Sequence, residues 1–220
     1  MTAISDTLVR MDRMYRYQRY IYDVTRKFYL LGRDRLLDEL VLSPGDHVLE
    51  IGCGTGRNLR ALARRHPGVQ FYGIDASAPM LATAARSIGQ AGLAGRIRLA
   101  HGLAERLDPA SMFGLRRPLD AIVISYALTM IPSWAAVVET AVHHLRPGGR
   151  LAVVDFSDQS GLPAWFRRLL VAWLAAFDVR LRAGLPDFFR NLVRTHGGTL
   201  RIEQMYGGYA FRLVYTAPAH

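Results

Sequence analysis

Short apolar runs alternate with longer amphipathic stretches through most of the chain. Runs rich in valine, isoleucine, leucine and phenylalanine, bounded by glycine, proline or charged residues, predict strands at 47–51, 70–74, 96–100, 119–125 and 150–156. The stretches between them repeat apolar residues at helical spacing, which predicts helices at 57–65, 79–91 and 132–145. Strands and helices that alternate in this rhythm form right-handed βαβ units, so we expect an α/β fold with a doubly wound, mostly parallel sheet.

The N-terminal region departs from this rhythm. Residues 11–42 have a helical pattern rich in tyrosine, with a second helix expected at 33–42. Tyr15, Tyr22 and Tyr29 lie seven residues apart and share one helical face, which fits either packing on the core or a lid over a polar site.

The region after the last parallel strand also differs. Residues 162–181 carry large apolar side chains with tryptophan and arginine at the margins, which predicts an amphipathic helix. Such a helix packs on the sheet by default, and its aromatic and arginine residues also fit an anionic bilayer surface. A further helix is expected at 186–195, and segments 199–206 and 209–217 alternate like a hairpin.

These patterns predict one domain over residues 1–220. Its expected parts are an N-terminal helical lid at 1–44, a core at 45–157, a helical insertion at 158–198 and a C-terminal hairpin at 199–220.

The glycine-rich turn within 48–58 carries the first candidate chemistry. Gly52, Gly54 and Gly56 alternate with small residues between a short apolar run and a helical pattern. Such a strand–turn–helix unit lets backbone N–H groups approach a ligand that side chains would otherwise block. The dinucleotide fingerprint G-x-G-x-x-G would need its third glycine at position 57, where this chain has arginine. The spacing therefore argues against a dinucleotide.

Asp75 follows the second predicted strand, about 20 residues past the glycines, where a carboxylate can hydrogen-bond both ribose hydroxyls of an adenosine. An aspartate at a strand end can instead cap the next helix. Because Ser77 and Pro79 already open that helix, we expect Asp75 to be free for the ligand.

The net charge of +10 favours a polyanionic partner, either a nucleic acid or an anionic membrane surface. An arginine-rich surface without any partner is the alternative. The single cysteine, Cys53, excludes an internal disulfide and reads as a small filler of the glycine turn. The N-terminus lacks the apolar core of a signal peptide, and the apolar stretch 169–177 is far shorter than the ~20 residues that span a bilayer. We therefore expect a cytoplasmic protein, and no cluster of metal-ligand type predicts a metal.

The segments EIGCGTGRN (50–58), GIDAS (73–77) and LRPGGRLAVVDF (145–156), in that order, resemble the class I S-adenosylmethionine (SAM) methyltransferases. The resemblance implies a Rossmann-like, mostly parallel seven-stranded sheet with a terminal antiparallel hairpin. It also implies SAM as cofactor and S-adenosylhomocysteine (SAH) as its product.

The resemblance assigns cofactor-binding roles by position. The residues expected around the methionyl end are Gly52, Gly54, Gly56 and, on the lid, Tyr22 and Arg26. Glu50 and Cys53, in the same stretch, are also expected to bind the cofactor. Those expected around the adenosine are Asp75 at the ribose, Ala76 and Met80 beside adenine, and Leu103 and Ala104 at its edge. Ser125 and Tyr126 would face the sulfonium. The family often has an aspartate at the position of Leu103, so adenine is here left to backbone groups and apolar packing.

Two further stretches, 15–34 (YRYQRYIYDVTRKFYLLGRD) and 206–218 (YGGYAFRLVYTAP), look like the bacterial betaine-lipid N-methyltransferases. That resemblance implies trimethylation of diacylglyceryl-homoserine to its betaine, by a peripheral enzyme at the anionic inner face of the membrane.

The chemistry of such a reaction suggests the substrate residues. Methyl transfer from a sulfonium is an in-line displacement that needs alignment and exclusion of water, and no metal. Aromatic faces stabilise a quaternary ammonium product, and arginine can hold a headgroup carboxylate. We expect Tyr22 and Tyr126 to orient the amine. The other expected substrate contacts are Tyr15, Arg16, Tyr29, Tyr206 and Tyr209.

Other acceptors stay open at this point. Methylation of phosphatidylethanolamine or of a quinone shares both the core and a basic face. Methylation of an RNA base usually shows an (Asp/Asn)-Pro-Pro-aromatic turn after the fourth strand, where this chain has Ser-Tyr-Ala-Leu at 125–128, so we expect no nucleic acid partner. A non-catalytic SAM-binding sensor also stays open, although the intact glycine turn argues against loss of the cofactor. The oligomeric state does not follow from the sequence.

Overall fold

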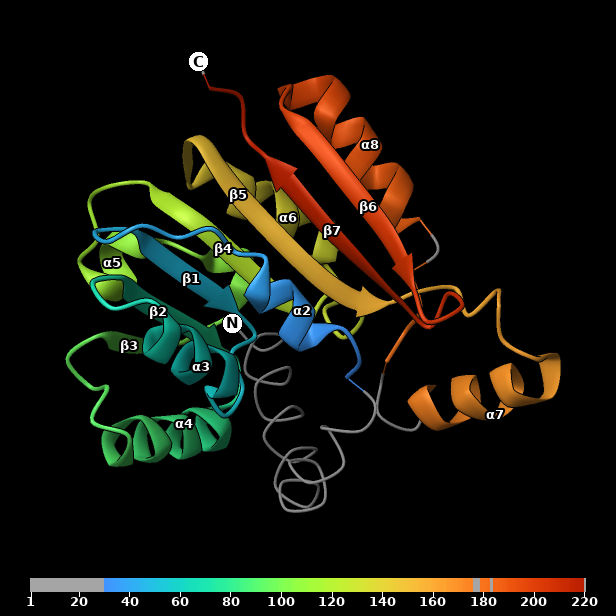
Figure 1. Cartoon of the computed structure of the whole chain (residues 1–220), viewed down its shortest axis with the longest axis horizontal. Coiled ribbons are helices and arrows are strands. Elements are labelled where there is room, and N and C mark those ends of the chain that lie inside the picture. The colour runs from blue at the N-terminus through green and yellow to red at the C-terminus, as the bar shows by residue number, and fades with distance from the viewer. Residues whose placement is uncertain (1–29, 176–178, 183, 220) are drawn as a thin grey trace, which may run out of the picture. The chain divides into compact units, whose positions relative to one another are not determined.

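The computed structural model describes residues 30–175, 179–182 and 184–219 (Figure 1). Its strands form a seven-stranded mixed sheet, which confirms the predicted α/β fold. The described residues divide into two compact units, one of 30–31 and 41–119 and one of 32–40 and 120–219.

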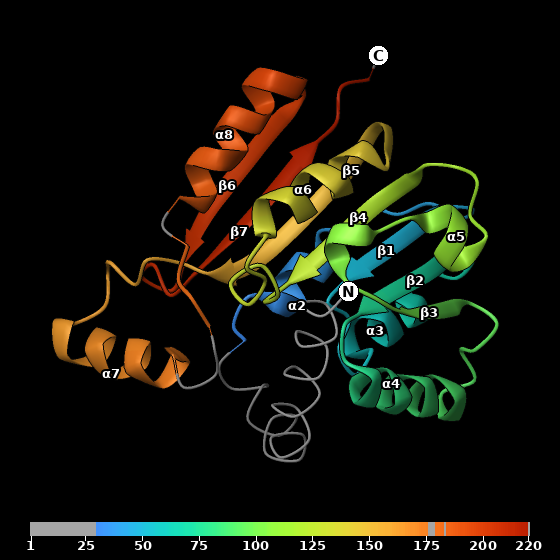
Figure 2. The ribbon, with the colours of Figure 1, turned by 180° about the vertical axis from the view of Figure 1, so that it is seen from behind.

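The first unit is built from parallel strands and the helices between them. Its elements are β1 (His47–Ile51), α3 (Arg57–Arg65), β2 (Gln70–Asp75), α4 (Ala78–Gln90), β3 (Ile97–His101), the 3₁₀ turn η1 (Ala104–Arg106) and α5 (Pro109–Phe113). Strand β2 pairs in parallel with β1 on one side and β3 on the other. Helices α3 and α4 contact the β2–β3 strands from one face (Figure 1), and α5 contacts β3 from the other (Figure 2).

The second unit has a mixed sheet. Its elements are α2 (Arg33–Asp38), β4 (Leu119–Ser125), α6 (Trp134–His143), β5 (Leu145–Phe156), α7 (Ala164–Ala175), α8 (Leu185–His196), β6 (Thr199–Met205) and β7 (Ala210–Thr216). Strand β7 pairs antiparallel with both β5 and β6, so the predicted terminal hairpin is confirmed. Helix α2 lies on one face of this sheet, and α6 and α8 lie on the other (Figures 1 and 2). Every residue of β4 is buried, as expected of a continuous apolar run.

Helix α2 contacts the β6–β7 hairpin in two ways: Gly32 lies close to Met205, and Glu39 forms an ion pair with Arg212. Gly32 precedes it with φ of 78°, and a Cβ there would lie 2.5 Å from the Met205 methyl carbon. The Arg212 guanidinium, which is almost fully buried in β7, pairs with Glu39 and Glu203. Because Arg212 is buried and has two glutamate partners, its charge stays paired when one of them is removed.

Several expected elements differ from the structure. The strand expected at 150–156 begins at Leu145, and the helix expected at 132–145 spans Trp134–His143. The helix expected at 33–42 ends at Asp38. Helix α5 was not expected, because five residues are too few to show a helical period. The helix expected at 162–181 does not include 179–182, because the Arg180 N–H donates to the Thr129 carbonyl at 3.0 Å and the Arg182 guanidinium to that of Ile131 at 3.3 Å.

Within the described ranges, none of the helices combines the length and apolar character needed to cross a membrane.

Gly73, in the middle of β2, lets the glycine-rich turn approach this strand. A Cβ at position 73 would lie 2.6 Å from a methyl group of Leu59 and 2.8 Å from the Cys53 Sγ. Both contacts are shorter than real Cβ atoms make, so the buried side chains of Leu59 in α3 and Cys53 in the turn would have to shift.

Gly73→Ala is therefore expected to destabilise the protein by about 1–3 kcal/mol through overpacking. It should also weaken SAH binding, because the displaced turn carries the candidate cofactor site. Urea unfolding and calorimetric titration measure the two effects. Gly89→Ala is the matched control, since its Cβ meets nothing within 4 Å in α4. Equal stability of the two variants would contradict the close approach.

Candidate functional site

The chain turns sharply between the end of β1 and the start of α3. Gly52, Gly54 and Gly56 have φ of 71°, 53° and 71°. These are left-handed values that L side chains rarely adopt, so the alternation of glycines has a backbone reason. Gly56 is the N-cap of α3.

The N–H groups of this turn are largely used within the protein. Those of Gly52 and Cys53 both donate to the Ile74 carbonyl, at 2.9 and 3.1 Å, and that of Gly56 donates to the Cys53 carbonyl at 2.9 Å. The expectation that these groups point at a ligand is therefore wrong for these three residues. The first turn of a helix leaves N–H groups that the helix itself does not bond, and at α3 these supply the partial positive charge for an anionic ligand group.

Asp75 joins three segments at the carboxyl end of β2. Its Oδ2 accepts from the Gly54 N–H at 2.7 Å, and its Oδ1 accepts from the Ser77 N–H at 2.9 Å. Ser77 caps α4 as predicted, with its Oγ accepting from the Met80 N–H. The expectation that Asp75 is free is wrong, because both oxygens already accept a backbone hydrogen bond. A carboxylate oxygen can accept a second hydrogen bond, so a partly exposed Asp75 still fits ribose hydroxyls.

Glu50 and Cys53 are buried beneath the turn. The Asn58 amide donates to the Glu50 Oε1 at 2.7 Å, which ties the end of β1 to the first turn of α3. Burial, with the charges of Asp75 and Glu50, raises the pKa of the Cys53 thiol well above its ordinary value. The thiol stays protonated at neutral pH, as a filler would. Both residues shape the turn from below.

The residues expected around adenine follow two adjacent strand ends. Ala76 follows β2, Leu103 and Ala104 follow β3, and all three are partly exposed. Met80 is buried in α4. Sequence analysis gave no role to His101, whose Nε2 lies 3.1 Å from the Ala76 carbonyl oxygen and fixes that segment. Its signal in the sequence was a histidine at the last position of β3.

Tyr126 heads an aromatic cluster in the second unit. Its φ of 54° is strained for a residue with a side chain, and its N–H donates to the Val154 carbonyl at 2.8 Å. Its ring packs edge-on against Phe156 with centroids 4.7 Å apart, and Phe156 packs against Tyr209 at 5.7 Å. The structure thus brings two sequence-predicted tyrosines together through a phenylalanine that sequence analysis missed.

Both cluster phenols are neutral at physiological pH. Burial raises the pKa of Tyr126 far above its ordinary value and that of Tyr209 to about 12. Neutral phenols present an aromatic face and a hydroxyl dipole, which suits orientation of an amine rather than proton abstraction. Ser125 is buried at the end of β4, and Tyr206 is half exposed in the β6–β7 turn. The remaining predicted residues, Tyr15, Arg16, Tyr22, Arg26 and Tyr29, lie outside the described residues.

Asp155 holds the loop that follows β4. It is fully buried and accepts from the Thr129 N–H at 3.2 Å, the Thr129 hydroxyl at 2.7 Å and the Phe156 N–H at 2.8 Å. Burial raises its pKa to about 6, although these hydrogen bonds act in the other direction. We predicted no role for Asp155 from the sequence. The feature that could have pointed to it is an acidic residue inside a mostly apolar strand.

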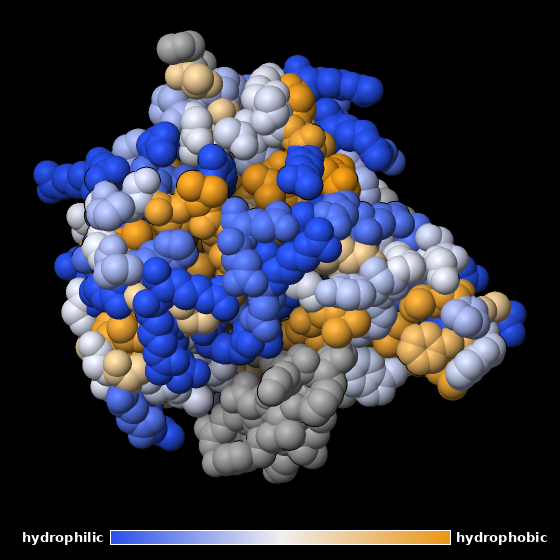
Figure 3. Space-filling view, viewed as in Figure 1, coloured by the Kyte–Doolittle hydropathy of each residue, from blue (hydrophilic) through white to orange (hydrophobic). Residues whose placement is uncertain are grey.

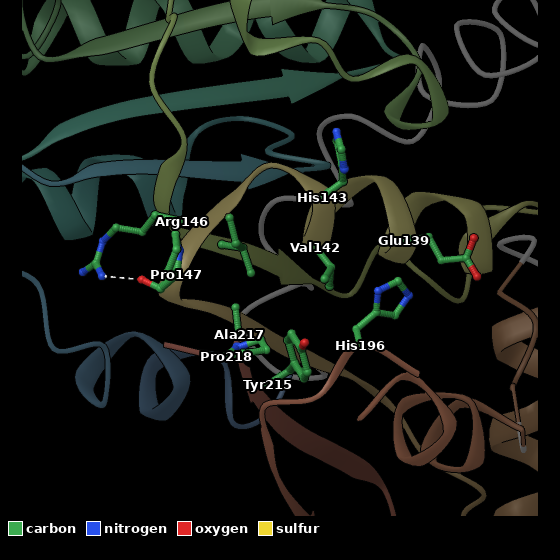
Figure 4. A pocket seen from close by; sticks show the side chains of 10 residues that line it. Glu139, Val142, His143, Arg146, Pro147, His196, Tyr215, Ala217 and Pro218 are labelled. Carbon is green, nitrogen blue, oxygen red and sulfur yellow. Dashed lines mark hydrogen bonds between the residues drawn. The ribbon is translucent and has the colours of Figure 1, made fainter. Parts of the chain in front are cut away.

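An open pocket of 280 Å³ lies elsewhere in the second unit, at the amino end of β5 (Figure 4). Its labelled lining residues are Glu139, Val142, His143, Arg146, Pro147, His196, Tyr215, Ala217 and Pro218. In α/β sheets of this type ligands bind at the carboxyl ends of the strands, so this pocket is at the wrong end for the cofactor. Within the described part of the chain, no group of three or more metal-ligand side chains gathers, here or elsewhere.

Comparison with known proteins gives one family match. Residues 49–151 match the model described as "Methyltransferase domain". The chain is 32% identical to nocamycin O-methyltransferase of Saccharothrix syringae, over 66% of this chain and 50% of that protein. It is 32% identical to demethylmenaquinone methyltransferase of Beutenbergia cavernae, over 71% of this chain and 61% of that protein. The chain thus spans between half and two thirds of the length of these curated relatives.

A solved O-methyltransferase family protein from Burkholderia thailandensis has a similar structure. The TM-score is 0.69 at 19% identity, and the match covers 94% of this chain and 62% of that one. This likeness shows the fold.

Residues 49–151 thus resemble a methyltransferase domain, and the chain has the fold of a solved methyltransferase family protein. SAM is the cofactor of such domains, and the residues fit it: a glycine turn, a helix N-terminus for the methionyl carboxylate and a strand-end carboxylate for the ribose. When bound, SAM supplies an activated methyl group on sulfur.

Asp75→Ala is expected to weaken SAH binding roughly 10- to 100-fold, because it removes charge-assisted hydrogen bonds worth about 1.5–3 kcal/mol. Calorimetric titration measures the dissociation constant. Asp108→Ala is the matched control, because the Asp108 side chain accepts from the Ala110 N–H at the start of α5 in a similar way. Unchanged SAH affinity in Asp75→Ala would remove the ribose role.

The raised pKa of Asp155 predicts a pH-dependent stability. Between its ordinary value of 3.8 and about 6, the folded protein holds a proton that the unfolded chain has lost, so the free energy of unfolding falls as pH rises. A shift of about two units corresponds to about 3 kcal/mol. Urea unfolding at pH 4 and pH 7.5 should show this loss in wild type relative to Asp155→Asn. The prediction would be contradicted if the free energy of unfolding of wild type, minus that of the variant, stayed constant or rose with pH.

Proposed function

We propose that the protein transfers methyl groups from SAM to the amine of diacylglyceryl-homoserine, in three rounds that give the trimethylated betaine. The observation that carries this is the buried aromatic cluster of Tyr126, Phe156 and Tyr209. Aromatic faces stabilise a quaternary ammonium by about 0.5–2 kcal/mol, and this advantage grows as methyl groups replace N–H hydrogen bonds to water. The sequence resemblance at 15–34 and 206–218 supports the same acceptor.

Each round breaks one bond and forms one. With SAM bound, the amine lone pair would form a bond to the methyl carbon that SAM supplies, as the C–S bond breaks and sulfur keeps its electron pair. The ammonium form of the substrate has no lone pair, so a proton must leave before attack. The neutral Tyr126 hydroxyl orients the nitrogen, and Asp155, being fully buried, positions the loop that carries Tyr126.

The acceptor is met at a membrane. A net charge of +10 attracts an anionic lipid surface, and the proposed substrate is a lipid. We place the protein at the inner face of the membrane as a peripheral protein, with no nucleic acid partner.

Methylation of a quinone is the second candidate. The similarity to a protein named demethylmenaquinone methyltransferase supports it. Quinones also reside in bilayers, so the basic charge fits both acceptors. They differ at the reacting atom, because a quinol oxygen or carbon yields no permanent cation for the aromatic cluster to bind.

Incubation with methyl-labelled SAM separates these acceptors. The panel is diacylglyceryl-homoserine, phosphatidylethanolamine, a demethylated naphthoquinol and RNA, each followed by extraction and mass analysis. Label in the mono-, di- and trimethylated homoserine lipids is expected. Label confined to the naphthoquinol, phosphatidylethanolamine or RNA would refute the betaine-lipid proposal.

Tyr126→Phe is expected to slow the methylation steps about tenfold or more, because the hydroxyl no longer orients the nitrogen. The SAH dissociation constant should change little. Tyr215→Phe is the matched control, since its hydroxyl bonds the Gly197 carbonyl at 3.1 Å in the same unit. Wild-type rates in Tyr126→Phe for all three methylations would remove the orienting role.

A further inference from the structure

Helix α7 exposes large apolar side chains to an unusual degree. Trp165 is 68% exposed and Leu169 is 64% exposed, while Phe166, Val171 and Trp173 are each more than a third exposed. Leu174 is the one buried side chain in this helix. The expected default, packing against the sheet, is therefore not what the structure shows.

The exposed side chains form one stripe. Trp165, Leu169 and Trp173 recur every four residues and share a helical face, with Phe166 beside it. Apolar side chains gather on the surface where α7 lies (Figure 3). A contiguous exposed patch of this kind marks an interaction site, whereas scattered single residues do not.

The positive charge of α7 favours an anionic partner. The helix carries Arg167 and Arg168 and has no acidic residue. Exposed Arg180 follows it in the chain. Two copies of this helix face to face would bring like charges together, whereas an anionic bilayer complements them. Tryptophan, with an apolar ring and one N–H, is the side chain that favours the boundary between headgroups and acyl chains.

The chain before α7 is locked to the turn between β6 and β7. The Gly161 N–H donates to the Gly207 carbonyl at 3.0 Å, and a Cβ on Gly161 would lie 2.6 Å from that oxygen. The buried Gln159 donates its amide to the Tyr209 carbonyl at 2.8 Å. Because this turn carries Tyr206 and Tyr209, α7 is held at one side of the proposed substrate residues.

The chain after α7 is tied to the loop that follows β4. The Arg180 N–H bonds the Thr129 carbonyl, and the Arg182 guanidinium bonds that of Ile131. Thr129 is the residue that Asp155 holds, three positions beyond Tyr126. Both ends of the α7 segment are therefore bonded to the segments that form the aromatic cluster.

We propose that α7 docks the protein on an anionic lipid bilayer. Trp165, Phe166, Leu169 and Trp173 enter the boundary between headgroups and acyl chains, and Arg167 and Arg168 meet lipid phosphates. This deepens the proposed function, because docking through α7 places the Tyr126–Phe156–Tyr209 cluster next to the surface from which a lipid headgroup is taken.

Vesicle co-sedimentation of the full chain tests the proposal. The probes are phosphatidylcholine vesicles with and without phosphatidylglycerol, over a salt series. Trp165→Ala/Leu169→Ala/Trp173→Ala should lower the partition coefficient on anionic vesicles at least about tenfold, because three exposed apolar side chains no longer insert. Arg167→Glu/Arg168→Glu should lower it most at low salt, because screening weakens the attraction of the wild-type arginines. Unchanged SAH affinity shows that each variant is folded.

Val41→Ser is the matched control, since Val41 is 73% exposed and lies outside α7. It should bind vesicles as wild type does. In wild type, brominated acyl chains should quench tryptophan emission, and the triple variant should lose most of this quenching. Wild-type partition by the triple variant would overturn the proposal. So would a wild-type dimer that binds no vesicles and that the triple variant converts to monomers.

These measurements can refute the docking proposal and the proposed function independently of each other. A chain that binds vesicles through α7 but labels none of the lipids retains the docking helix and refutes the betaine-lipid function. A chain that methylates diacylglyceryl-homoserine in detergent, yet whose triple variant binds anionic vesicles normally, retains the function and refutes the docking helix.

Discussion

The carboxylate of Asp75 is the interaction on which the cofactor side of the fold depends. It accepts from Gly54 in the glycine-rich turn and from Ser77 at the start of α4, so one side chain sets the positions of two loops and the end of β2. Gly73 makes this possible, because the Cβ of any other residue at this position would collide with the side chains of Cys53 and Leu59. The Asp75 carboxylate and the first turn of α3 are therefore already in place before a ligand binds. This preorganisation lowers the entropic cost of binding.

In the second unit, Asp155 holds a loop by hydrogen bonds in the same way. It too lies near the carboxyl end of a strand and accepts hydrogen bonds from a neighbouring loop, but it is fully buried. The loop it holds begins with the strained Tyr126, whose ring packs on Phe156 and through it on Tyr209. The same loop and the β6–β7 turn bond the two ends of the α7 segment. The aromatic cluster and both ends of the α7 segment are thereby linked through short hydrogen-bonded connections.

The sequence alone was sufficient for most of the fold. The bounds of β1, α3 and β4 match the structure to the residue, because buried parallel strands are continuous apolar runs bounded by turn residues. It failed where tertiary hydrogen bonds decide the conformation, as at 179–182, and where an element is as short as α5. In the candidate site, residue types predicted a ribose role for Asp75, but they did not predict that it binds two backbone N–H groups. Asp155, Phe156 and His101 were missed because their roles arise from neighbours distant in sequence.

A crystal structure of the protein with SAH would test whether Asp75 binds the ribose while it holds the glycine-rich turn. We expect both ribose hydroxyls within hydrogen-bond distance of the Asp75 carboxylate, with the Gly54 N–H still donating to it and the methionyl end at the first turn of α3. Adenosine bound away from Asp75, or an Asp75 that must release Gly54 to admit the ribose, would refute this double role.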